Sequence, residues 1–182
     1  LTATILPVHA EKVISIADGD TLTILHDNKP LRIRLADIDA PEKTQAFGER
    51  SKQSLSTMCF GKDATYQVRD IDKYGRTVAR VTCAGIDVNQ AQVEKGLAWV
   101  YSEYNTDITL PGKQATAQAN ATGLWADKAP VPPWAFRHEN QSGLSHSGRS
   151  GQANTAKAGT ECHIGPRGGR YKLVNGKKRY GC

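Results

Sequence analysis

Apolar and polar residues alternate along several short segments in the first half of the chain, which is the pattern of half-buried β-strands. Residues 12–17 and 21–26 are rich in β-branched residues and alternate in this way, with a turn at 18–20 between them. A second turn at 27–30 leads into another alternating run at 31–38. Three short strands joined by turns predict an antiparallel meander.

The pattern then changes to a helical one and back again. Residues 45–59 have a helix-forming composition, whereas 64–69 and 77–83 alternate as strands. Asn89 is expected to cap a short helix, and Pro111 is expected to open an Ala-rich one. Five strands grouped as three plus two, with three helices, predict a mainly β fold with α-helices: a five-stranded Greek-key barrel of the OB type.

Composition separates a body from a tail. A proline-rich segment at 129–133 marks the end of the barrel domain, to which we assign residues 11–137. Residues 138–159 are rich in Ser, Gly, Asn, Gln and Ala and predict a flexible linker. Residues 160–182 resume patterned sequence around Asn175-Gly176, which predicts a small β-hairpin module.

The first ten residues, L-T-A-T-I-L-P-V-H-A, look like the remnant of a secretory signal peptide with cleavage after Ala10. The alternative is an N-terminal strand, which Pro7 disfavours. We therefore expect an exported protein, secreted or periplasmic. No apolar run reaches the length of a membrane span, so we expect none.

The distribution of charge supports a division of the chain into a body, residues 1–137, and a tail, residues 138–182. The 182 residues carry a net charge of +6, and 38% of them are hydrophobic, which indicates a globular chain. Residues 1–137 hold 16 Lys+Arg and 16 Asp+Glu, whereas residues 138–182 hold eight and two. The whole excess therefore lies in the tail, which indicates a polyanionic partner for that part.

Acidic residues gather where predicted strands end. They are Asp18, Asp20, Asp39 and Glu42. Such carboxylates repel one another unless a cation or arginines compensate them, and oxygen ligands without His or Cys point to Ca²⁺ or Mg²⁺. Arg34 lies on the same predicted strand as Asp39, and Arg76 follows a turn. Each motif alone is an ordinary turn or strand end, but together they are what phosphodiester hydrolysis needs.

Together these residues resemble the staphylococcal nuclease (thermonuclease) family over roughly residues 12–126. The matching segments occur in the family's order, with its helix between the second and third. They are A-D-G-D-T at 17–21, R-L-A-D-I-D-A-P-E at 34–42, D-K-Y-G-R at 72–76, and V-N to G-L-A at 88–98. The resemblance implies an OB barrel with three helices, in agreement with the hydrophobic pattern.

The resemblance also implies a role for each matching residue. The carboxylates of Asp20 and Asp39 and the backbone carbonyl of Ala40 would bind Ca²⁺, with Asp18 supporting the ion through water. The family often has Thr at position 40, a change of little consequence if the main chain binds the metal. Glu42 would activate or orient the attacking water.

The remaining matches would contact the substrate. The guanidiniums of Arg34 and Arg76 would hold the phosphate and offset its extra charge in the transition state. Contacts to the nucleotide fall to Lys73, Tyr74, Tyr101 and Tyr104. The implied reaction is Ca²⁺-dependent hydrolysis of DNA and RNA to 3′-phosphate products, with single-stranded or frayed substrate preferred. The competing hypothesis is a non-catalytic nucleic-acid-binding or uptake protein; in either case we expect a monomer.

The four cysteines of an exported chain suggest two disulfides, for which three pairings are open. Cys59–Cys83 is favoured because one residue ends a helix and the other ends a strand expected nearby. Cys162–Cys182 would then bracket the hairpin. Free thiols are the alternative, and a zinc site at the tail lacks an evident fourth ligand.

The tail resembles small basic adaptor modules with the signature G-P-R-G-G-R-Y followed by G-K-K. Its cations would neutralise phosphates of a nucleic acid. They are Arg167, Arg170, Lys172, Lys177, Lys178 and Arg179. The alternatives are a solvated charged hairpin or one that binds an anionic cell surface.

Overall fold

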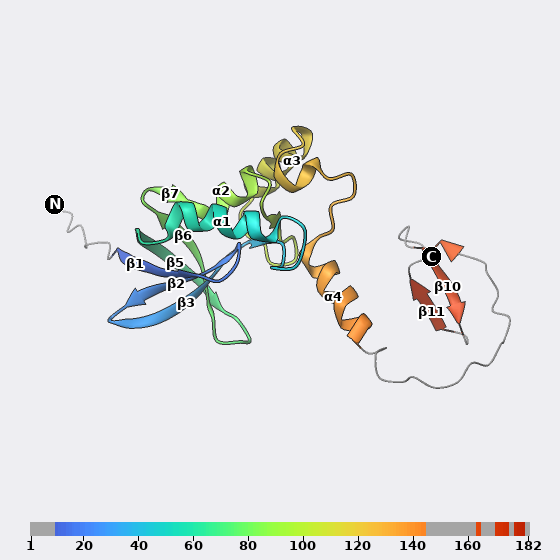
Figure 1. Cartoon of the computed structure of the whole chain (residues 1–182), viewed down its shortest axis with the longest axis horizontal. Helices are drawn as coiled ribbons and strands as arrows, with labels where there is room; N and C mark the ends of the chain where they lie inside the picture. Colours follow the sequence, from blue (N-terminus) through green and yellow to red (C-terminus); the bar gives the residue numbers. More distant parts are fainter. Residues whose placement is uncertain (1–9, 145–162, 165–169, 175–176, 181–182) are drawn as a thin grey trace. The chain divides into compact units, whose positions relative to one another are not determined.

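The computed structural model describes residues 10–144, 163–164, 170–174 and 177–180, and the chain separates into two compact units, 1–144 and 145–182. The expected signal remnant at 1–9 and most of the expected linker lie outside the described residues. Unit 1 contains a β-barrel with helices against one side (Figure 1).

Five strands form the barrel and confirm the predicted OB-type architecture. They are β1 (Glu11–Ile16), β2 (Thr21–His26), β3 (Lys29–Leu35), β5 (Asp63–Ile71) and β6 (Thr77–Cys83). The strand order is β3-β2-β1-β5-β6, and the parallel pairing of β3 with β6 closes the sheet on itself. Closure places Arg34 beside Thr21 on one neighbour and beside Val78 on the other.

The expected strand at 31–38 is interrupted, because Asp37 turns the chain at a φ of 67°. Its carboxylate Oδ1 accepts hydrogen bonds from the backbone N–H and the hydroxyl of Thr106, at 2.7 and 3.1 Å. After this turn β4 (Ile38–Asp39) leaves the barrel and pairs with β8 (Trp99–Val100). The break therefore places Asp39 opposite Trp99, the first residue of β8.

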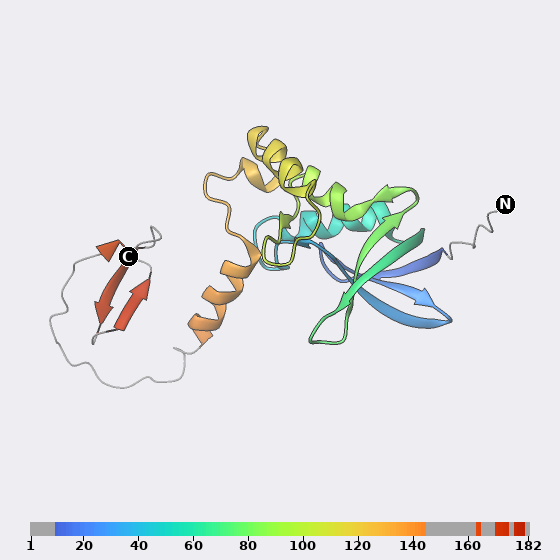
Figure 2. The same cartoon turned by 180° about the vertical axis from the view of Figure 1, so that it is seen from behind.

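The helices lie mostly on one side of the barrel, as two opposite views show (Figures 1 and 2). They are α1 (Gly48–Cys59), α2 (Val88–Glu94), α3 (Leu110–Ala119), the 3₁₀ helix η1 (Gly123–Ala126) and α4 (Pro133–Leu144). Three of the α-helices match the predicted ones. The fourth, α4, runs past residue 137, where the sequence suggested the end of the domain.

The predicted cap of α2 is wrong by two residues. Asp87, the last residue of the two-residue strand β7 (Ile86–Asp87), is the N-cap, and its carboxylate accepts from the N–H of Gln90. Asn89 is instead 1% exposed and bonds the backbone of β6 and of Ala36. An interior amide that satisfies three backbone groups joins α2 to the barrel wall.

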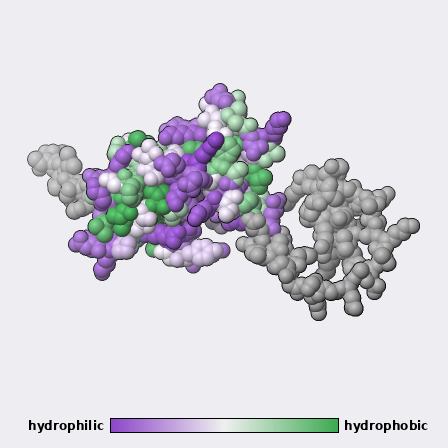
Figure 3. All heavy atoms as spheres, viewed as in Figure 1, coloured by the Kyte–Doolittle hydropathy of each residue, from purple (hydrophilic) through white to green (hydrophobic). Residues whose placement is uncertain are grey.

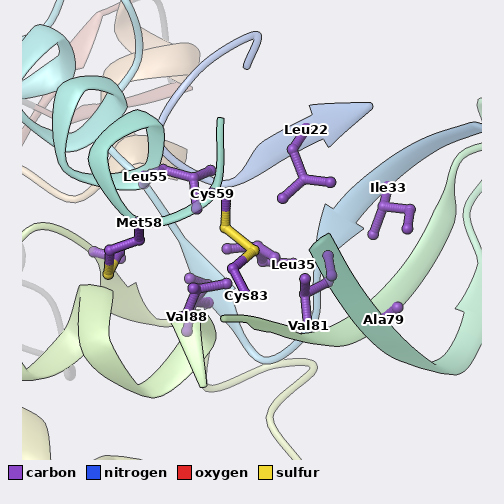
Figure 4. Packing of buried hydrophobic residues seen from close by; sticks show 14 of the residues in the cluster. Leu22, Ile33, Leu35, Leu55, Met58, Cys59, Ala79, Val81, Cys83 and Val88 are labelled. Atoms are coloured by element: carbon purple, nitrogen blue, oxygen red, sulfur yellow. A yellow bond between two sulfur atoms is a disulfide. The ribbon is translucent and has the colours of Figure 1, made fainter. Parts of the chain in front are cut away.

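The core fills the barrel and the space beneath α1 and α2. Leu22, Ile33 and Val81 are fully buried inside it, and Leu55 and Met58 of α1 pack against them (Figure 4). The predicted Cys59–Cys83 disulfide is present there, with a Cα–Cα distance of 5.2 Å, and it joins the end of α1 to the end of β6. The predicted Cys162–Cys182 bridge falls on residues outside the described part.

The surface of unit 1 seen in Figure 3 mixes polar and apolar residues. The large exposed apolar residues belong to different elements, among them Phe60, Ile71 and Ile108. Among the described residues, no helix is long and apolar enough to cross a membrane.

Unit 2 contains the predicted hairpin. Its strands β10 (Arg170–Val174) and β11 (Lys177–Tyr180) pair antiparallel, with Tyr171 opposite Tyr180. A third strand, β9 (His163–Ile164), adds to β10 on its other edge. The basic positions 170, 172 and 177–179 therefore all lie on two adjacent strands, whereas Arg167 is outside the described residues.

The cross-link between Cys59 and Cys83 should contribute to the stability of unit 1, since it closes a loop with a sequence separation of 24. Replacing both residues by Ala should lower the free energy of unfolding by about 3 kcal/mol, measured by urea denaturation under oxidising conditions. In reductant, the wild type should lose most of this advantage over the variant. Equal midpoints under oxidising conditions would contradict the prediction.

Candidate active site

Two buried aspartates form the centre of the site. Asp20 precedes β2 and is 4% exposed, and Asp39 ends β4 and is 1% exposed. Their segments are held side by side, because the backbone N–H of Ala40 donates to Asp20 Oδ2 over 2.9 Å. The structure thus brings together three of the residues that the sequence grouped as a metal-binding set.

Arg34 of β3 connects the two carboxylates. Its Nη1 lies 2.9 Å from Asp20 Oδ2, and its Nη2 lies 2.9 Å from Asp39 Oδ1 and 3.3 Å from the carbonyl oxygen of Ile38. Burial by itself lowers the pKa of the Arg34 guanidinium, but the two carboxylates outweigh it and raise that pKa above its ordinary value. The guanidinium is therefore a permanent positive charge between two buried negative ones.

Asp20 occupies an unusual electrostatic position. Burial raises the pKa of its carboxyl above the ordinary value, Arg34 opposes the rise, and Asp18 adds to it. The hydroxyl of Thr21 donates to the other carboxylate oxygen over 2.9 Å, and Asp18 in turn accepts from the N–H of Asp20. Asp18 thus lies beside Asp20, one of the two buried carboxylates.

The turn that carries Asp18 and Asp20 is anchored from α2. Gln92 is fully buried, and its Nε2 donates to the carbonyl oxygen of Gly19 over 2.7 Å and to that of Ser51 over 3.0 Å. Gly19 also packs so closely that an added Cβ would lie 1.9 Å from the Ser51 hydroxyl. Sequence reasoning missed Gln92, since a lone Gln in a short helix carries no distinctive signal.

Glu42 follows the aspartates on a short loop. Its N–H donates to the side-chain oxygen of Gln45 over 3.0 Å, and its carbonyl lies against Gly48, where an added Cβ would come within 2.0 Å. Its side chain is 39% exposed. The loop therefore fixes the backbone of Glu42 and leaves its carboxylate partly exposed, at the edge of the site that holds Asp20 and Asp39.

Arg137 of α4 also reaches this site, and the sequence analysis did not include it. Its Nη2 lies 2.8 Å from Asp39 Oδ2, and its Nη1 lies 2.7 Å from Glu42 Oε1. Burial lowers the pKa of this guanidinium, but the two carboxylates outweigh that effect and raise it. The sequence did contain one signal for α4, because Pro133 is its first residue and proline is common at the first position of a helix.

Aromatic rings line the site beside α4. Tyr101 lies near Asp39, whose charge, together with burial as the larger cause, raises the pKa of the phenol. Its ring stacks on Trp134 at 5.4 Å between centroids, and Tyr104 contacts its other side at 4.8 Å. The structure therefore places Tyr101 near Asp39, whereas Tyr104 contacts Tyr101 and is largely exposed.

The β5–β6 turn carries three more of the predicted residues, with a different set of contacts. The Arg76 guanidinium pairs with Asp72 at 2.6 Å and lies 5.5 Å from the ring centroid of Tyr74. The Nζ of Lys73 lies over the same exposed ring, 5.2 Å from its centroid. Among the described residues, the hydrogen bonds and ion pairs of this turn do not reach Asp20 or Asp39, although Arg76 directly precedes the segment of β6 that pairs with β3.

The donor chemistry of the site suits a hard divalent cation. Two carboxylates and the Ala40 carbonyl supply oxygen alone, which favours Ca²⁺ or Mg²⁺ over softer metals. Within the described residues, no three His, Cys, Asp or Glu side chains form a ready metal cluster.

Comparison with known proteins agrees with this geometry. The family model described as "Staphylococcal nuclease homologue" matches residues 32–127. An "Uncharacterized endonuclease" of Escherichia coli is 44% identical over 128 residues, 70% of this chain and 84% of that protein. One of Haemophilus influenzae is 41% identical over 135 residues, with 74% and 76% covered. A "Micrococcal nuclease" of Shigella flexneri is 34% identical over 143 residues, with 72% and 82% covered. The chain belongs to the staphylococcal nuclease family.

Proposed function

We propose that the protein is a Ca²⁺-dependent nuclease that hydrolyses phosphodiester bonds of DNA and RNA. The observation that carries the proposal is the buried pair Asp20 and Asp39, bridged by Arg34 and flanked by Glu42. Two carboxylates buried beside each other are costly, and a divalent cation would add to the compensation that Arg34 and Arg137 supply. Family membership supports nuclease chemistry and dependence on a metal ion.

In this proposal Asp20, Asp39 and the carbonyl of Ala40 hold the ion, and Asp18 supports it through water. A bound Ca²⁺ supplies positive charge that polarises a non-bridging phosphate oxygen. Glu42 accepts the proton of the attacking water, for which its partly exposed position at the edge of the site is suitable. Both tasks use groups whose backbone is fixed by hydrogen bonds.

The arginines act on the phosphate. Arg34 is committed to two carboxylates, so on substrate binding it contributes charge to the site from a fixed position. Arg76 lies in a turn with its partner Asp72, and it would exchange that carboxylate for the substrate phosphate. As water adds to phosphorus, the P–O5′ bond would break, and the leaving 5′-oxygen would take a proton from solvent. The products would therefore carry a 3′-phosphate and a 5′-hydroxyl, as the family resemblance implies.

The nucleotide would lie along the exposed aromatic residues. Tyr74 is 73% exposed and Tyr104 is 63% exposed, and each can stack on a base. Lys73 lies beside Tyr74 and can pair with a neighbouring phosphate. Tyr101 borders the site near Asp39. Because stacking needs unpaired bases, single-stranded or frayed substrate is preferred in this proposal.

We further propose export as a monomer. The disulfide between Cys59 and Cys83 supports an oxidising compartment, secreted or periplasmic, because such bonds are rare in the reducing cytosol. The basic tail is proposed to tether the enzyme to nucleic acid, since five of its six candidate cations lie on the two strands of one hairpin.

Changing Glu42 to Gln should lower kcat on single-stranded DNA by about 10²- to 10⁴-fold, because the amide cannot accept the proton of water. The measurement is cleavage of a labelled oligonucleotide in Ca²⁺, with a parallel reaction in chelator that should show no cleavage. Glu49→Gln, at an exposed position of α1, is the matched control and should behave as the wild type. Cleavage in chelator, or full activity of Glu42→Gln, would contradict the mechanism; tight binding without cleavage by the wild type would favour the binding-protein alternative.

Removing residues 145–182 should leave kcat on short oligonucleotides nearly unchanged, because the described active-site residues all lie in unit 1. Affinity for long polymers should fall by about tenfold at low salt, with a shallower salt dependence, since fewer phosphates are neutralised. A full-length variant with Lys177, Lys178 and Arg179 changed to Gln should reproduce much of the loss and separates charge from chain length. Equal affinities across the salt series would exclude tethering.

A further inference from the structure

Residues 131–137, which lead into α4 and form its first turn, contact the active site through Val131, Trp134 and Arg137. The Nε2 of Gln45 donates to the carbonyl oxygen of Val131 over 2.6 Å, while its Oε1 holds the N–H of Glu42. Trp134 stacks on Tyr101 with an interplanar angle of 4°. Arg137 follows Trp134 by three residues and so lies on the same face of the helix. The start of α4 is therefore a wall of the active site.

The guanidinium of Arg137 bridges two carboxylates with different proposed tasks. One nitrogen binds Oδ2 of Asp39 at 2.8 Å, and the other binds Oε1 of Glu42 at 2.7 Å. Arg34 binds the opposite oxygen of Asp39, so both oxygens of this carboxylate are held by arginines. A planar fork with two fixed contacts sets the orientation of Glu42 relative to Asp39.

We propose that Arg137 is a positioning residue for hydrolysis. By holding Oε1 of Glu42, it directs the second oxygen, Oε2, toward the attacking water, and it fixes the plane of the Asp39 carboxylate. The proposal rests on the proposed nuclease function. It adds a residue outside the segment that the family model matches, which ends at residue 127.

The charges of the site support a guanidinium that remains in place. Asp18, Asp20, Asp39 and Glu42 contribute four negative charges, and Arg34 and Arg137 contribute two positive ones. The remaining formal charge of −2 equals in size the charge of one divalent cation, so charge balance by itself does not require Arg137 to leave when an ion binds. The competing interpretation is a simple counterion that the metal expels.

Two measurements on Arg137→Ala separate these interpretations. Calorimetric titration with Ca²⁺ should show a Kd about three- to tenfold lower, because a positive charge next to the ligands is lost. Steady-state cleavage of an oligonucleotide should show a kcat lower by about 10- to 100-fold, with KM changed by less than about threefold. Arg50→Ala, at an exposed position of α1 with its guanidinium over Phe47, is the control and should match the wild type in both.

The two opposite changes, tighter metal binding and slower turnover, are the signature of a positioning residue. A kcat equal to or above that of the wild type would show an expelled counterion. Unchanged Ca²⁺ affinity would show that Arg137 does not contact the carboxylates in solution, and weaker Ca²⁺ affinity with lower kcat would indicate a general loss of structure. Each of these results would overturn the proposal.

Chemical rescue adds a readout that a structural role would not produce. Guanidinium ion at about 20 mM, well below denaturing concentration, should restore part of the kcat of Arg137→Ala relative to NaCl of equal ionic strength. Arg137→Lys should retain an intermediate kcat, because it keeps the charge but lacks the planar fork; no rescue would count against the proposal. An inactive wild type in Ca²⁺ would reject the proposed function instead, and the calorimetric comparison would still test the contact between Arg137 and the carboxylates.

Discussion

The arrangement of the whole site depends on one guanidinium that two buried carboxylates share. Arg34 lies between Asp20 and Asp39, and removing it would leave Asp20 in the interior without its ion-pair partner and Asp39 with Arg137 alone. Buried charges that lose their partner typically cost about 3–5 kcal/mol. The barrel therefore has to place β2, β3 and β4 so that all three side chains meet.

That placement follows from the closure of the barrel. The parallel pairing of β3 with β6 fixes Arg34, and the turn at Asp37 brings Asp39 back toward it. Two buried amides then connect α2 to this frame: Asn89 bonds the backbone around β6, and Gln92 bonds the turn before β2. Asn89 is bonded through both its amide oxygen and its amide nitrogen, and Gln92 is bonded through its amide nitrogen, so these directional contacts help to fix where α2 sits.

α4 extends the site beyond the barrel. Its contacts through Gln45, Tyr101 and the two carboxylates differ in kind, namely a hydrogen bond, an aromatic stack and an ion pair. A helix held only by apolar packing could slide along its axis, but a bidentate guanidinium tolerates little displacement. The segment after the barrel thereby becomes part of the site, while the basic hairpin belongs to unit 2.

Much of the fold and of the site could be predicted from the sequence, because local patterns carried the information. Alternation identified the five strands, and the conjunction of Asp20, Arg34, Asp39 and Glu42 identified the carboxylate site before their contacts were known. The pairing of Cys59 with Cys83 followed from the ends of two adjacent elements. Such features depend on residues that are near in sequence or on a recurring order of motifs.

Other features could be decided only by the tertiary structure. Asn89 is a residue type that commonly caps helices. Because α2 packs against β6, however, its side chain bonds buried backbone groups, and Asp87 is the N-cap instead. Arg137 is separated from Glu42 by 95 positions, and no local pattern relates them. The sequence by itself determined the five strands of the barrel, three of the α-helices, and which carboxylates belong together. The tertiary structure decided which distant side chains compensate those carboxylates, because charge compensation depends on distance in space and not on separation along the chain.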